Sequence, residues 1–161
     1  MIPELGHFFL IAALLLSLFL IFIPFFSKRK SDIRIMNLSI SISRGIFTLV
    51  TLSFLMLIYA FLNDDFSVLN TARNSNSMLP WYYKIAATWG SHEGSLLLWI
   101  FMLSTWMLLV SIFNKKLPMD ILSSTLSVMG YIMVGFLAFL LFTSNPFDRI
   151  IPPALDGNDL N

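Results

Sequence analysis

The sequence predicts an all-α, polytopic integral membrane protein with four transmembrane helices and a short interfacial helix in an outer loop. Of its 161 residues, 57% are hydrophobic and only 12% are charged, whereas soluble proteins carry about 25% charged residues. Four uncharged apolar segments approach the roughly 20 helical residues that a bilayer core needs, and open backbone is too costly in lipid. Aromatic residues also gather between the second and third segments.

The first predicted hairpin covers residues 1–62, with apolar segments at 8–26 and 46–62. The second segment is short, but it can extend back to residue 38. We expect the first segment to be retained rather than cleaved, because Glu4 precedes it and basic residues follow it, the reverse of a signal peptide.

The distribution of Lys and Arg predicts the orientation. Seven of these ten residues fall on one side of the predicted membrane: Lys28, Arg29, Lys30, Arg34, Arg44, Lys115 and Lys116. Because basic residues are enriched in cytoplasmic loops, this side should face the cytoplasm. Both termini, both histidines and most acidic residues should then face outward.

Residues 63–94 form the predicted outer loop. Residues 70–77 read as irregular loop, whereas residues 80–89 read as a short interfacial helix. Pro80 suits a first helical position, and Trp81, Ile85 and Trp89 follow at helical spacing. Indole and phenol rings favour the headgroup level, and the plainer alternative is an aromatic belt without a specific function.

The second predicted hairpin covers residues 95–142, with apolar segments at 95–113 and 121–142. Trp106 should lie near mid-membrane and pack against another helix. Gly130 and Gly135 are five residues apart, so they do not form a small-xxx-small association motif. The absence of charge inside the four segments argues against a secondary transporter.

His92 and Glu93 are the candidate chemical groups, at the outer mouth of the third transmembrane helix. Ser91 suits the N-cap, and Glu93 suits the positive end of the helix dipole. One alternative is therefore a helix start with a solvated histidine, and the other is a contact with haem or its propionates. A zinc-protease motif is excluded because position 96 is Leu96, and His7 is read as interfacial rather than as a ligand.

Composition removes further classes of function. With no cysteine, the chain forms no disulfide and offers no thiolate. A net charge of +1 without a basic tract gives no electrostatic footprint for nucleic acid.

Several segments resemble the CcmF family of bacterial cytochrome c haem lyases, which has NrfE as a close relative. The resemblance is carried by MIPELG at 1–6, NSNS at 74–77, LP at 79–80, YK at 83–84, Ala87, WGSHEGSLLLW at 89–99, FTSNPF at 142–147 and GNDLN at 157–161. It implies a bacterial inner-membrane protein with these motifs in the periplasm. It also implies a role in the attachment of haem to apocytochrome c. The implied partners are apocytochrome c, the haem chaperone CcmE, CcmH, CcmI and the lipid bilayer.

Members of that family are much longer, and their haem-ligating segments lie beyond residue 161. The resemblance therefore implies a truncated, split or partial lyase, with residues 143–161 as a shortened outer tail. We expect it to need the remaining part of the lyase and not to be catalytic alone. His92, Trp89 and Trp81 are the candidate haem contacts. The rivals are a structural subunit of a respiratory membrane complex and a non-functional fragment of a split lyase gene.

Overall fold

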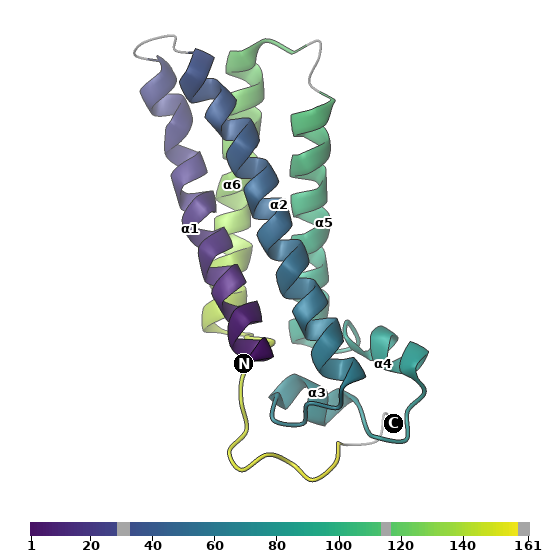
Figure 1. The fold of residues 1–161 in the computed structure, drawn as a ribbon. Helices are drawn as coiled ribbons and strands as arrows, with labels where there is room; N and C mark the ends of the chain where they lie inside the picture. The colour runs from purple at the N-terminus through teal and green to yellow at the C-terminus, as the bar shows by residue number, and fades with distance from the viewer. Residues whose placement is uncertain (29–32, 114–116, 158–161) are drawn as a thin grey trace.

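The computed structural model describes residues 1–28, 33–113 and 117–157, with side chains of residues 25–36 left aside. Its helices are α1 (Ile2–Lys28), α2 (Ile33–Leu62), α3 (Leu69–Asn74), α4 (Trp81–Ala87), α5 (His92–Ile112) and α6 (Met119–Phe142). Figure 1 shows α1, α2, α5 and α6 as a bundle of long helices, with α3 and α4 at one end. The predicted all-α architecture is confirmed.

The four long helices are each long and apolar enough to cross a membrane, over Ile2–Pro24, Asn37–Leu62, His92–Ile112 and Met119–Phe142. Helix α2 packs against α1, α5 and α6, while α1 and α5 also contact α6. Their facing sides form one apolar core, which includes Leu10, Leu20, Ile46, Leu57, Leu97, Ile100, Met107, Leu126, Met133 and Leu137. The prediction of four transmembrane helices is confirmed.

Small and hydroxylated residues join the helices inside this core. Ser39 Oγ lies 3.0 Å from Ser123 Oγ, and the Ser53 hydroxyl donates to the Gly6 carbonyl over 3.0 Å. At Gly130, a Cβ would lie 3.0 Å from Leu20 Cδ2. Small residues of this kind let helix backbones approach closely in lipid. Gly130 therefore has a packing role that its spacing from Gly135 did not indicate.

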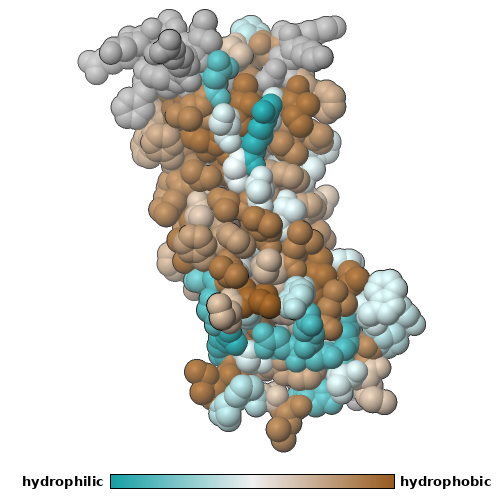
Figure 2. Space-filling view, in the orientation of Figure 1, coloured by the Kyte–Doolittle hydropathy of each residue, from teal (hydrophilic) through white to brown (hydrophobic). Residues whose placement is uncertain are grey.

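Residues 63–91 and 143–157 form a compact unit at one end of the bundle, here called the outer cap. Residues 70–77 were predicted to be loop, but their first part belongs to α3. The tail pairs with the loop through an isolated bridge between Val68 and Arg149. Arg149 also forms an ion pair with Glu4, which ties the N-terminus to the cap. Figure 1 shows the N-terminus, α3, α4 and the tail at the same end, where Figure 2 shows hydrophilic side chains concentrated.

Arg44 and Trp106 both have exposed side chains on the long helices. Helix α2 begins at Ile33, so the second apolar segment does extend back past residue 38, and Arg44 lies within this helix. Trp106 was expected to pack against another helix, yet its side chain is 60% exposed. It points away from the described bundle because the inward positions of α5 are filled by smaller residues such as Ser104 and Met107.

Candidate functional site

The candidate site is built around the first turn of α5. Ser91 is the N-cap, and its hydroxyl accepts a hydrogen bond from the Gly94 amide over 2.9 Å. Gly94 is required here, because a Cβ would collide with the carbonyl of Thr88. The backbone therefore fixes His92 and Glu93 in the first turn, where amide groups are free of helical partners and the dipole favours negative charge.

A polar pocket of about 240 Å³ opens beside this turn. Its walls come from α3, the start of α5 and the tail after α6: Leu69, Asn70, Arg73, Asn74, Ser91, His92, Glu93, Thr143, Ser144, Asn145 and Asp148. His92 Nδ1 lies 3.1 Å from Ser144 Oγ, and the imidazole meets the Phe139 ring edge-on at 6.3 Å. The His92 ring is thus oriented by the tail and by α6.

Asn70 lines this pocket and has a buried side-chain donor without a partner among the described residues. Its side chain is only 4% exposed, and its Oδ1 accepts from Asn74 Nδ2 over 2.9 Å. Its own Nδ2 finds no partner among the described residues. Arg73 adds an exposed positive charge, while Glu93 and Asp148 add negative ones. Such a wall suits a small polar group with both donors and acceptors.

The second histidine approaches the same stretch of tail. His7 Nδ1 lies 3.4 Å from Asn145 Oδ1, while His92 contacts the preceding residue, Ser144. Residues 144 and 145 therefore lie between the two imidazoles of the chain. Sequence reasoning did not find this role of the tail, because 52 and 138 residues separate the partners. Within the described ranges, no group of three or more His, Asp or Glu is arranged to hold a metal ion.

Helix α4 presents aromatic side chains outward while it is held by one buried charge. Trp81 is 67% exposed, and Trp89, just after the helix, is 40% exposed. Neither belongs to the lining of the pocket at His92. Lys84 is buried and pairs with Asp64 at 2.5 Å. The partner of Lys84 is therefore Asp64 and not Glu93, which lines the pocket at His92.

The end of the described tail is fastened to the outer loop. The Ser77 amide and hydroxyl donate to the Asp156 carboxylate over 3.0 and 2.8 Å. These hydrogen bonds hold the pKa of Asp156 below its usual range, and the bond from the Ser77 amide has the largest effect. The carboxylate therefore stays charged and bound to Ser77 at neutral pH.

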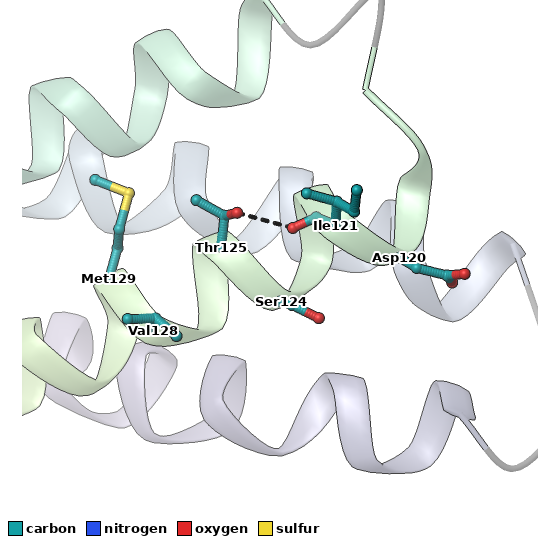
Figure 3. A pocket seen from close by; sticks show the side chains of 6 residues that line it. All are labelled: Asp120, Ile121, Ser124, Thr125, Val128 and Met129. Atoms are coloured by element: carbon teal, nitrogen blue, oxygen red, sulfur yellow. Dashed lines mark hydrogen bonds between the residues drawn. The ribbon is translucent and has the colours of Figure 1, made fainter.

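A shallow hollow of about 480 Å³ lies at the opposite end of the bundle, on the outward side of α6. Figure 3 shows that its six lining residues all come from α6, with the Thr125 hydroxyl bonded to the Ile121 carbonyl and Asp120 pointing away from the others. Asp120 occupies the first turn, where the helix dipole stabilises a carboxylate. A shallow surface formed by a single helix does not bring together groups from different elements, so we assign no reaction site to it.

The chain is similar in sequence to proteins named for cytochrome c biogenesis. A family model described as "Cytochrome C assembly protein" matches residues 89–161. The cytochrome c-type biogenesis protein CcmF of Pseudomonas aeruginosa is 51% identical over 162 residues, which cover 100% of this chain and 25% of that protein. CcmF of Escherichia coli is 45% identical, with the same coverage. NrfE of Haemophilus influenzae is also 45% identical, again over 100% of this chain and 25% of the relative.

A solved structure named "Cytochrome c Heme Lyase CcmF" superposes with a TM-score of 0.84 and 28% identity. The match covers 92% of this chain and 25% of that structure. The chain therefore spans about a quarter of the length of the relatives that it matches.

Proposed function

We propose that this chain, which corresponds to the N-terminal part of a CcmF-type cytochrome c biogenesis protein, forms part of the membrane scaffold of a haem lyase. The observation that carries the proposal is the match to CcmF proteins, in sequence over the whole chain and in fold over 92% of it. The alternative of a structural subunit in a respiratory complex rested on composition alone. The relatives named for cytochrome c biogenesis give it no support.

In this proposal the chain lies in a bacterial inner membrane with the outer cap in the periplasm. The haem lyase reaction joins haem vinyl groups to cysteine thiols of apocytochrome c, and the remaining part of the lyase would complete the site. CcmH and CcmI would present the apocytochrome, and CcmE would deliver haem. The support for a role beside that reaction is the position of the polar pocket and the exposed aromatic residues in one cap.

The pocket at His92 fits only a small part of a haem. Its volume of about 240 Å³ is below the roughly 300–1,000 Å³ typical of ligand pockets, and its wall is polar. A propionate carboxylate suits Arg73 and the free amides of α5, whereas the macrocycle would have to lie outside against Trp81 or Trp89. In this chain, His92 would orient a carboxylate rather than hold the iron.

A chimera tests the scaffold role. The 161 residues replace the corresponding quarter of the Pseudomonas aeruginosa CcmF protein in a strain that lacks its own CcmF. We expect this chimera to restore covalent haem staining of cytochrome c, while the relative without that quarter does not. A chimera that inserts into the membrane at normal levels without restoring any mature cytochrome would contradict the proposal.

The same strain tests the haem contact. Replacing Trp89 and His92 by alanine in the chimera should lower mature cytochrome c while the protein still inserts and assembles, because only ligand handling is disturbed. Tyr131→Ala, at an exposed position of α6, is the matched control. Normal cytochrome maturation in the double variant would leave these residues with a structural role alone.

A further inference from the structure

The outward face of α2 changes character along its length. Asn37, Ser41, Arg44 and Thr48 follow one another at three- or four-residue steps and are all exposed. Toward the C-terminal end of α2, the same face continues with the apolar side chain of Leu55 and with Tyr59. Residues at these steps lie above one another on a helix. We call the polar half of this face, with Asn37, Ser41, Arg44 and Thr48, the α2 seam. Figure 2 shows a band of hydrophilic side chains over the upper half of the bundle, where Figure 1 places α2.

Arg44 lies at the depth of the first apolar segment. The neighbouring Gly45 lies against Leu16, which is the ninth residue of the 19-residue apolar run at 8–26. The guanidinium therefore starts from a backbone position at the depth of the hydrocarbon.

The polar groups of the seam differ in how they are satisfied. The Thr48 hydroxyl donates to the Arg44 carbonyl over 2.9 Å, so it needs no outside partner. Arg44 makes no ion pair with any residue that the structure describes. The Arg44 guanidinium, with its five N–H donors and its positive charge, is exposed on the outside of the bundle.

Lipid tails do not satisfy these groups. Charged residues inside membrane spans almost always face another helix or a polar cavity and pair there. Ser41 and Thr48 on either side of Arg44 are small, which lets a second helix approach closely. The other sides of α2 are already occupied by α1, α5 and α6, so the seam is the side left for a further helix.

We infer that the α2 seam docks a transmembrane helix from the remaining part of the lyase, and that this helix carries a carboxylate opposite Arg44. The inference rests on the proposed function for the identity of the partner. It is supported by the charge of Arg44, for which the described residues offer no counter-ion, and by relatives about four times as long as this chain.

The experiment uses the full-length chimera, with a protease site placed at the junction after residue 161. A photoactivatable phenylalanine analogue replaces Ser41. After irradiation and cleavage, the two parts should remain joined on a denaturing gel. Arg44→Leu should lower the joined fraction roughly three- to tenfold, the range expected for loss of one polar contact between helices. Thr48→Val is the matched control and should leave it unchanged, because the Thr48 hydroxyl is bonded within its own helix.

Three outcomes would overturn the inference. Adducts formed only with lipid would show that Arg44 reaches a headgroup phosphate instead. Adducts between two copies of this chain would replace the lyase helix by self-association. A joined fraction unaffected by Arg44→Leu would remove the role of the charge. Cytochrome maturation is measured in the same cells, so joining without maturation would count against the proposed function, and maturation without joining against this inference.

Discussion

The ion pair of Lys84 and Asp64 joins two segments of the outer cap, the turn after α2 and helix α4. Their side chains are 8% and 29% exposed, so the ammonium group has little access to water. Removing one partner of a buried pair leaves an uncompensated charge, which is far more costly than removing a surface pair. Asp64 also has a positive φ of 52°, a conformation that Asp and Asn tolerate better than most residues.

Asp64→Asn should therefore destabilise the cap without distorting its backbone. The amide keeps the shape and the tolerance for positive φ, but it leaves the Lys84 charge unpaired. We expect the free energy of unfolding in detergent to fall by about 3 kcal/mol, with faster proteolysis within residues 63–94. Asp148→Asn is the control, because its exposed carboxylate makes no ion pair in the described structure, and it should change stability by less than about 0.5 kcal/mol. Equal stability of the two variants would disprove the role of the pair.

Contacts of the site within one helical turn could be predicted from the sequence, whereas contacts between distant segments could not. The Ser91 cap depends on contacts within one helical turn, so its position before an apolar run was enough to predict it. The contacts of His92 with Ser144 and of Lys84 with Asp64 depend on how the cap folds. A single sequence does not reveal such pairings, because several charged residues of the loop were equally available to Lys84.

At the scale of whole elements, α1 and α6 meet through a position without a side chain. Gly130 is buried against Leu20, and nearby the Ser127 hydroxyl donates to the Ile21 carbonyl over 3.0 Å. In lipid, helices associate through close packing and polar contacts because apolar surface alone gives little preference. The close approach at Gly130 is therefore a main determinant of this contact.

Gly130→Leu tests that contact. The added side chain has to displace Leu20, and overpacking of a tight core typically costs about 1–3 kcal/mol. We expect a lower unfolding midpoint in detergent and weaker cross-linking between cysteines placed in α1 and α6. Gly135→Leu provides the control on the same helix, since no atom lies within 4 Å of its Cβ position. A loss of stability in Gly135→Leu as large as that in Gly130→Leu would show that the loss does not come from the contact with Leu20.

The elements that the sequence predicted well are those defined by apolar runs of membrane length. The observed ends of these helices differ from the ends of the predicted apolar segments, because polar residues at the edge of a segment continue the helix. This occurs at the start of α2 and at His92, where α5 begins. Helix α3 was missed because six residues with mixed polarity carry no helical periodicity. Trp106 was misplaced because spacing indicates which residues share a face, but not whether that face points into the bundle.

At the scale of the whole molecule, the two ends of the bundle are chemically different. One end carries the cap with α3, α4, both histidines and the tail, and the other carries the connections between the paired long helices. The sequence places most Lys and Arg at those connections, some of them within residues 29–32 and 114–116, outside the described residues. The candidate site lies at the end of the bundle opposite Lys28 and Arg34, and the positive-inside rule predicts that the end with the candidate site faces the periplasm.

Cysteine labelling tests this orientation directly, because the chain has no cysteine of its own. Single cysteines at Met78 and Leu155 lie on the cap, where both side chains are largely exposed, and one at Leu117 lies at the opposite end. In intact cells, a membrane-impermeant maleimide should label the first two and should reach the third only after permeabilisation. Labelling at Leu117 with protection of Met78 and Leu155 would invert the orientation. The pocket at His92 would then open into the cytoplasm, away from any reaction on periplasmic apocytochrome, and the proposed role of the cap would fail with it.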